Sequence, residues 1–178
     1  MSDVQLRPAL PEEAEAVGAL TVAGYDADGY LMLADGSYDH EYAAWLADAV
    51  TRARDAVLIV AVDGEDLLGT VTWCPPGSSS RELSTRDDQG EFRTLSVAPE
   101  ARGRRVGSAL VDWCIAEARA TGLAEIRLSS LPEMTPAHRL YESRGFVRRE
   151  DLDWTPYPGV LLWGFSLALQ DIAGRVEA

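Results

Sequence analysis

Apolar residues along the chain occur in two patterns, short runs typical of strands and the three-to-four-residue spacing typical of helices. The alternation of these patterns predicts an α/β fold. Short apolar runs bounded by turn residues predict strands at residues 4–9, 57–64, 66–73, around 92–97, and at 124–130, 146–152 and 160–167. Helical spacing with start and stop residues predicts helices at 11–24, 38–53, 103–120 and 136–144. Polar or Pro-rich stretches predict loops at 77–90 and 153–159.

Chain length and composition favour one core. The 178 residues are 47% hydrophobic, which suits a single domain over residues 1–169 with a frayed tail at 170–178. No apolar run is long enough to span a membrane, and the first residues lack the charged and then apolar pattern of a signal peptide. We therefore expect a cytoplasmic protein without a membrane partner. Cys74 and Cys114 are expected to be free buried thiols, and the absence of a His cluster beside them predicts no metal.

Charge divides the chain into two unlike halves. The formal net charge is −13; residues 1–91 carry 18 acidic and 5 basic side chains, whereas residues 92–178 carry 11 of each. A phosphate backbone requires a continuous basic face, so this balance argues against nucleic acid as a partner.

The segment LSVAPEARGRRVGSAL, residues 95–110, predicts an anion site at a helix N-terminus. Pro99 ends the apolar strand, and the helix is expected to begin near Gly103. First-turn amides lack intrahelical acceptors, the helix dipole is positive there, and Gly103 and Gly107 let a ligand approach the backbone. Donors suited to phosphate oxygens are also present: Arg102, Arg104 and Arg105. The alternative is an ordinary strand–turn–helix with a solvated basic end, although three cations would oppose the dipole.

Spacing excludes two common nucleotide motifs, because neither GxGxxG nor GK[ST] is present in this segment. The segment resembles the first signature of the GNAT superfamily of acyl-CoA-dependent N-acyltransferases, [QR]xxGx[GA], behind a strand that ends in LxV. Arg105 departs from it, since the family usually has Gly there. A second signature, AxxLYexxGF, is matched by Ala137, Leu140, Tyr141, Glu142, Gly145 and Phe146, whereas Met134 replaces an Asn that many members carry.

The resemblance covers about residues 55–167 and implies the GNAT fold, a mixed, mostly antiparallel twisted sheet of six or seven strands flanked by about four helices. It implies acetyl-CoA as cosubstrate, an amine as acceptor and, as in many members, a homodimer. The Tyr141 phenol would protonate the departing thiolate, and the backbone of residues 95–97 would stabilise the oxyanion. The cofactor-binding residues carried over by the resemblance are Leu95, Ser96, Val97, Arg102, Gly103, Arg104, Arg105, Val106, Gly107 and Ser108.

A base is also needed, because a neutral amine must attack the thioester. Glu91 is the candidate, since it shares a strand face with Arg93 and precedes the anion site. A surface Glu91 paired with an Arg, or deprotonation through water, stays open. His138 lies one helical turn before Tyr141 and is interpreted either as a proton shuttle or cofactor contact, or as a helix surface residue.

Residues 25–42 are the candidate acceptor wall. They contain four of the six Tyr residues and five carboxylates, which would attract an amine. The substrate-binding candidates are Tyr25, Asp26, Tyr30 and Trp73, with Trp154 and Tyr157 as further aromatic walls. A solvated acidic surface loop is the alternative interpretation of the segment.

Three functions therefore stay open at this stage. The first is an N-acetyltransferase that moves an acetyl group from acetyl-CoA to a small cationic amine, a peptide or a protein amine by direct attack in a ternary complex. The second is a non-catalytic acyl-CoA-binding or regulatory module, for which Arg105 and Met134 argue. The third is a nucleotide-binding α/β domain.

Overall fold

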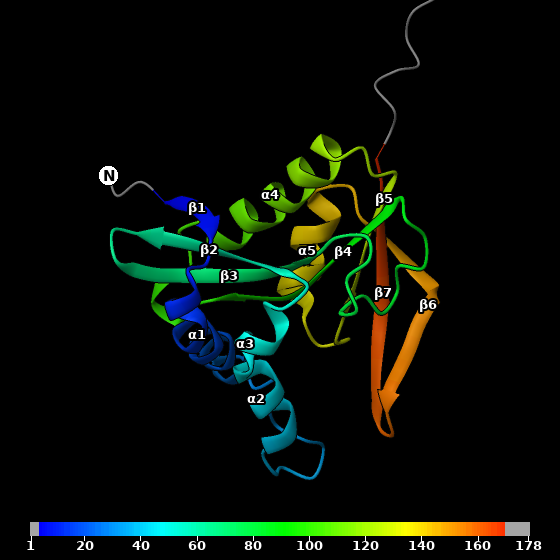
Figure 1. Ribbon diagram of the computed structural model, residues 1–178. Coiled ribbons are helices and arrows are strands. Elements are labelled where there is room, and N and C mark those ends of the chain that lie inside the picture. Colours follow the sequence, from blue (N-terminus) through cyan, green and yellow to red (C-terminus); the bar gives the residue numbers. More distant parts are fainter. Residues whose placement is uncertain (1–3, 170–178) are drawn as a thin grey trace, which may run out of the picture.

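A computed structural model describes residues 4–169, which form one seven-stranded sheet with helices on both faces (Figure 1). The strand order is β1-β2-β3-β4-β5-β7-β6. All neighbouring strands are antiparallel except β4 and β5. The strands are β1 (Gln5–Pro8), β2 (Val57–Asp63), β3 (Asp66–Cys74), β4 (Gln89–Val97), β5 (Glu125–Ser130), β6 (Val147–Tyr157) and β7 (Val160–Ala168). The predicted mixed, mostly antiparallel sheet is confirmed, while the predicted tail at 170–178 lies outside the described residues.

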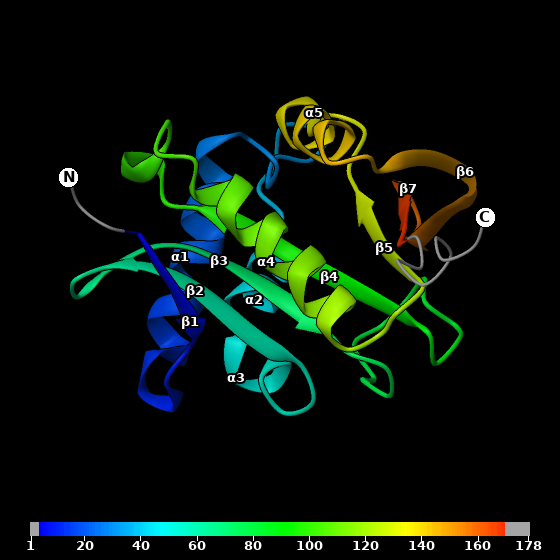
Figure 2. The same cartoon turned by 90° about the horizontal axis from the view of Figure 1, so that it is seen from above.

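Five α-helices cover the described part of the sheet. They are α1 (Ala14–Ala27), α2 (His40–Ala47), α3 (Ala49–Arg52), α4 (Val106–Ala120) and α5 (Thr135–Ser143), and a short 3-10 turn, Pro11–Glu13, precedes α1. Figures 1 and 2 show α4 on one face of β2 and β3, and α1 with α3 on the other. Helix α4 connects the parallel strands β4 and β5, as a crossover helix should.

Side-chain alternation along β2 explains why both faces are covered. Ile59 and Ala61 belong to the main core beneath α4, whereas Leu58 and Val60 point to the opposite face and pack against Val17 of α1. A strand that is apolar on both faces must be buried on both, so β2 requires the two helical layers.

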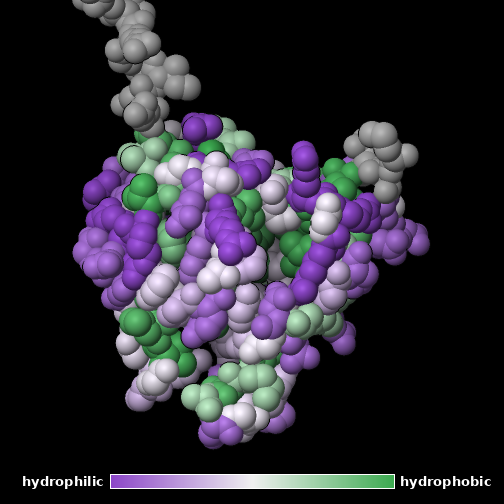
Figure 3. Space-filling view, turned by 180° about the vertical axis from the view of Figure 1, so that it is seen from behind, coloured by the Kyte–Doolittle hydropathy of each residue, from purple (hydrophilic) through white to green (hydrophobic). Residues whose placement is uncertain are grey.

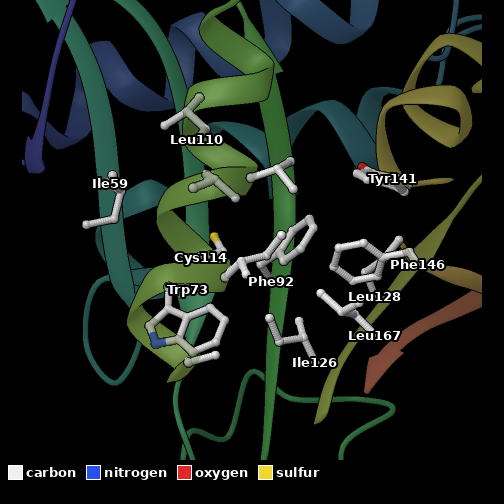
Figure 4. Close-up of a cluster of buried hydrophobic side chains, with 14 of the residues drawn as sticks. Ile59, Trp73, Phe92, Leu110, Cys114, Ile126, Leu128, Tyr141, Phe146 and Leu167 are labelled. Atoms are coloured by element: carbon white, nitrogen blue, oxygen red, sulfur yellow. The ribbon is translucent and has the colours of Figure 1, made fainter. Parts of the chain in front are cut away.

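Figure 4 shows the main core between α4 and the central strands. Trp73 is 3% exposed there and packs edge-to-face against Trp113. Cys74 and Cys114 are free and buried, as predicted, and burial raises the pKa of the Cys74 thiol to about 12. The two thiols therefore pack as small apolar groups.

The helix predicted over residues 38–53 is wrong as a single element, because it breaks at Asp48. The Asp48 carboxylate accepts the amide of Thr51 and so acts as the N-cap of α3. Behind the break, the Arg52 guanidinium donates to the carbonyls of Trp45 and Leu46 at the end of α2. These two side chains satisfy the backbone groups that the break exposes.

Both predicted loops prove partly extended. Gln89 and Gly90 already belong to β4, and most of 153–159 belongs to β6. Pro156 is tolerated because β6 is an edge strand, and Asp153 accepts the amide of Gly164 across the irregular pairing with β7. The other differences are small, because α4 begins at Val106 and α5 begins one residue early, at Thr135.

No helix in residues 4–169 combines the length and the apolar character needed to cross a membrane.

Candidate active site

Strand β4 separates from β5 after its first three residues. Only residues 89–91 of β4 pair with β5; beyond them β4 pairs with β3 alone, and residues 128–130 of β5 pair with β7. The register of β4 against β3 shifts at this point, and Thr94 has a φ of 50°, a left-handed conformation that a β-branched residue rarely adopts. The separation opens the sheet between β4 and β5.

A cavity of about 230 Å³ occupies this separation. The backbone of residues 94–97 forms one wall, residues 128–130 form the other, and α5 closes one side with Ala137, Leu140 and Tyr141. We call it the acyl cavity. Its position suits an extended chain that enters between the two strands.

Tyr141 lies in the lining of the acyl cavity and is 5% exposed. Its ring packs against Phe92, Phe146 and Phe165 at centroid distances of 5.8–6.0 Å. Figure 4 shows it on α5 at the edge of this aromatic group. Burial raises the pKa of the Tyr141 phenol far above its usual value, so the phenol keeps its proton at any physiological pH.

The N-terminus of α4 meets one end of the acyl cavity. Arg102 and Gly107 contribute to the lining. Gly103 has a φ of 79°, and Arg105, the N-cap of α4, has a φ of 60°. Helix geometry leaves the amides of residues 106–108 without intrahelical acceptors, since the first helical bond runs from Ala109 to Arg105. A pyrophosphate group fits this end of the cavity, because amides and an arginine converge there.

The ten predicted cofactor-binding residues divide into two groups. Leu95, Ser96, Val97, Arg102 and Gly107 line the acyl cavity, and Gly103, Arg104, Arg105, Val106 and Ser108 do not. Among the second group, Val106 is buried in the main core, and Arg104 pairs with Asp63 at 2.8 Å. The structure therefore brings the strand and the helix end together around one cavity, with Arg104 directed to the β2–β3 turn.

A second cavity of about 1030 Å³ adjoins the first, and we call it the acceptor cavity. The segment between α1 and α2 lines one side of it and the β6–β7 hairpin lines the other. Figure 3 shows the surface notched between these two parts of the molecule. Five carboxylates line it: Asp28, Asp39, Glu41, Glu82 and Glu133. The aromatic lining consists of Tyr30, Tyr42, Trp45, Trp154 and Tyr157.

Asp28, Tyr30 and Arg93 line both cavities and so form the junction between them. Asp28 accepts from Arg102 at 3.0 Å, and Arg93 pairs with Glu82 at 2.9 Å. Arg93 also lies over the ring of Trp45 at 5.0 Å. Each charge at the junction therefore has a partner, and the junction as a whole is polar.

Of the predicted acceptor residues, two take part in these cavities. Tyr25 and Tyr30 line the acyl cavity, and burial raises the pKa of the Tyr25 phenol to about 12. Asp26 is exposed on α1 and lines neither cavity, and Trp73 belongs to the main core, so the structure contradicts both assignments. Trp154 and Tyr157 line the acceptor cavity, as the aromatic-wall interpretation expected.

Glu91 does not occupy the position that the base hypothesis requires. It is 0% exposed and lines neither cavity. Its carboxylate accepts the amides of Glu82, Leu83 and Ser84 at 2.9–3.2 Å. The side chain ties the loop before β4 to the strand, and its oxygens are fully used by that loop.

The surface interpretation of His138 is also wrong, because His138 is 7% exposed beneath Trp163 and Phe165.

Sequence reasoning missed Arg93, Glu82 and Glu133 in the acceptor cavity. No local signal marks them, since each comes from a different part of the chain. Within residues 4–169, no group of three or more His, Cys, Asp or Glu side chains could hold a metal ion.

Comparison with known proteins agrees with this geometry. A sequence model of the acetyltransferase (GNAT) family matches residues 24–146. A mycothiol acetyltransferase from Geodermatophilus obscurus is 34% identical over 125 residues, 64% of this chain and 38% of that protein. Another, from Cellulomonas flavigena, is 30% identical over 148 residues, 77% of this chain and 42% of that protein. The chain therefore spans about two fifths of the length of these relatives.

Solved structures share the fold. A GCN5-related N-acetyltransferase from Rhodopseudomonas palustris superposes with a TM-score of 0.71 at 20% identity, covering 95% of this chain and 98% of that one. The PaiA N-acetyltransferase from Thermoplasma acidophilum, solved in complex with coenzyme A, gives a TM-score of 0.68 at 15% identity, covering 94% and 99%.

Proposed function

Because the chain belongs to the acetyltransferase (GNAT) family, we propose that it transfers an acetyl group from acetyl-CoA to a primary amine by direct attack within a ternary complex. The observation that carries this proposal is the pair of adjoining cavities. The smaller cavity ends at a helix N-terminus suited to a pyrophosphate, and the larger cavity is acidic. An amine in the second cavity reaches the first at the junction of Asp28, Tyr30 and Arg93.

On the donor side, the amides at the N-terminus of α4 and the Arg102 guanidinium bind the phosphates of acetyl-CoA. Within residues 95–97, which do not pair with β5, the backbone amides that face away from β3 donate to the thioester oxygen as it becomes an oxyanion. Tyr141 donates its hydroxyl proton to the departing sulfur. Burial raises the pKa of the phenol, so the proton is present when the sulfur leaves; the same shift makes the phenol a weaker acid, so its transfer depends on the negative charge that develops on the sulfur.

On the acceptor side, we infer a cationic amine such as a small polyamine, or the amine of a peptide or protein. Five carboxylates against the single cation Arg93 give the acceptor cavity a negative potential, which concentrates cations. Glu41 and Glu133 form no ion pair within the described residues, so both stay available to an ammonium group. The aromatic rings add faces on which alkylammonium groups bind.

A two-step experiment tests the proposal. Thermal stability is first measured with acetyl-CoA, CoA, ATP and NAD, and acetyl-CoA and CoA are expected to stabilise the protein. Release of free CoA thiol is then followed with a panel of amines and peptides. Tight CoA binding without transfer to any amine would indicate the non-catalytic module instead, and stabilisation by ATP alone would indicate a nucleotide-binding domain.

A further inference from the structure

Ser130 and His138 form a hydrogen-bonded pair in the wall of the acyl cavity. Ser130 is the last residue of β5 and belongs to the cavity lining, and His138 lies behind it on α5. The Nε2 atom of His138 is 3.1 Å from the Ser130 hydroxyl oxygen. The two residues are 4% and 7% exposed, so the contact is shielded from solvent.

The direction of this hydrogen bond determines whether His138 can accept a proton through Ser130. Which of the two atoms donates depends on the imidazole tautomer, and the Ser130 hydroxyl also lies 3.5 Å from the Leu131 carbonyl oxygen and 3.4 Å from the Met134 sulfur. A neutral imidazole has one N–H and one lone pair, so in the tautomer that carries its proton on Nδ1 the Nε2 atom accepts from the Ser130 hydroxyl. A basic nitrogen is thereby connected to the cavity through one hydroxyl group.

Packing holds the ring in this orientation. It stacks on Trp163 at 5.6 Å and contacts Phe165 at 4.9 Å. Burial lowers the pKa of His138 below its usual value, so the ring is neutral and able to accept a proton at neutral pH. Of the charged groups that face it, Arg148 also lowers the pKa, whereas Glu142 and Glu133 raise it.

We propose that Ser130 and His138 form a relay that takes the proton from the acceptor nitrogen as this nitrogen attacks the thioester. The relay rests on the proposed acetyl transfer and fills the base role that Glu91 leaves open. Asp28 is the sole carboxylate among the described lining residues of the acyl cavity, and it is paired with Arg102. Ser130, by contrast, presents a hydroxyl group that is hydrogen-bonded to Nε2 of His138.

The protons of the relay balance. The neutral amine forms a bond to the carbonyl carbon, and its nitrogen passes one proton to the Ser130 oxygen as the Ser130 proton moves to Nε2 of His138. The carbon–sulfur bond then breaks, and the sulfur takes the Tyr141 proton. After the products leave, the imidazolium returns its proton through Ser130 to water in the cavity and the phenolate regains one, so the overall change moves one proton from nitrogen to sulfur.

The pH dependence of kcat/KM distinguishes this relay from a purely structural histidine. For an alkylamine with a pKa near 10, the rate below that pKa falls in proportion to the neutral amine. In the wild type, kcat/KM should fall more steeply below the pKa of His138, with a dependence on one further proton. The reason is that a protonated imidazole cannot accept a proton from Ser130. In His138→Gln the additional loss should disappear, and kcat should fall about 100-fold.

The chain offers a matched control, because it contains two histidines. His40 is exposed on α2 and lines neither cavity, so His40→Gln should keep the wild-type rate and the wild-type pH profile. Ser130→Ala removes the hydroxyl with little change in volume and should lose kcat to a similar degree, while the thermal shift with acetyl-CoA stays as in the wild type. This second variant decides the matter if His138→Gln does not fold.

The relay would be overturned if either variant kept kcat within about twofold of the wild type and also kept the wild-type fall in kcat/KM at low pH. Such a result would leave acetyl transfer itself intact. If the wild type itself transferred acetyl to no amine, the relay and the proposed function would both be wrong. The two failures are therefore separated by the wild-type measurement alone.

Discussion

At the scale of single residues, Tyr141 and Glu91 show how far a motif assigns chemistry. Tyr141 belongs to a signature, and the structure places it in the lining of the acyl cavity. Glu91 was inferred from strand alternation alone, and it lies on the expected strand but beneath a loop that uses its carboxylate. Alternation determines a face, yet what covers that face depends on contacts from elsewhere in the chain.

Replacing Tyr141 by Phe should lower kcat about 100-fold and change the Kd for acetyl-CoA by less than about twofold. The ring keeps its packing, and only the proton donor is lost. Steady-state kinetics and calorimetry measure the two quantities. Tyr38→Phe is the control, since Tyr38 lines neither cavity. Full activity in Tyr141→Phe would remove the phenol from the mechanism.

Replacing Glu91 by Gln should destabilise the protein rather than slow the reaction. The amide group supplies one acceptor oxygen where the carboxylate serves several backbone amides, so the unfolding free energy should fall by about 1–3 kcal/mol. Denaturant unfolding measures this loss, and the exposed Glu150→Gln should show none. A folded Glu91→Gln protein with a large loss of kcat would restore Glu91 as a candidate base.

At the scale of elements, the sequence predicts that a strand, a turn and a helix follow one another around residue 105, but it does not predict the residue at which the helix begins. The sequence indicates where β4 ends and that a helix follows, because Pro99 and the glycines are local signals. It places the helix start too early, since Gly103 and Arg105 both adopt left-handed conformations before the first helical residue. The family's preference for Gly at this position agrees with the observed φ of Arg105.

The left-handed conformation of Arg105 predicts that Arg105→Gly stabilises the protein. Removing the Cβ relieves about 1–2 kcal/mol of strain in the left-handed backbone. This gain exceeds the free-energy cost of the more flexible unfolded chain, so Tm should rise by a few degrees. Gly103→Ala is the converse test: its φ is 79° and a Cβ there would contact nothing within 4 Å, so its expected loss of stability comes from the backbone alone. Calorimetry that shows a lower Tm for Arg105→Gly would contradict the assigned strain.

The division of residues 38–53 into α2 and α3 illustrates a second limit at this scale. Asp48 can cap a helix or lie within one, and helical spacing continues through it. The break is favoured because Arg52 can then satisfy the last carbonyls of α2. This compensation comes from a side chain whose position only the folded structure shows.

At the scale of the whole molecule, the acidic half and the neutral half meet at the two cavities. The α1–α2 segment contributes carboxylates to the acceptor cavity, and β4 with α4 contributes the acyl cavity. The charge division between the two halves is readable from the sequence, whereas the junction between the cavities is not. Arg93, Glu82 and Glu133 reach the acceptor cavity from β4, from the loop before it and from the segment before α5, and pairing of distant segments has no local signal.

The charge of the acceptor cavity predicts a loss of affinity for cations when Glu41 and Glu133 are both changed to Gln. The KM for a cationic amine should rise about threefold or more at low salt, and the effect should shrink as salt screens the carboxylates. Initial rates at two ionic strengths test this prediction. Glu65→Gln in the β2–β3 turn is the control, because Glu65 belongs to the same acidic half but lines neither cavity. An unchanged KM in the double variant would place the amine elsewhere.

The most direct measurement follows acetyl-CoA labelled in its acetyl group as it reacts with a primary amine in the presence of the enzyme. The account predicts that the label appears on the amine nitrogen, that free CoA forms in equal amount, and that no label stays on the protein when the amine is withheld. Labelled acetate without labelled amine, or label retained covalently on the protein, would contradict direct transfer between the two cavities.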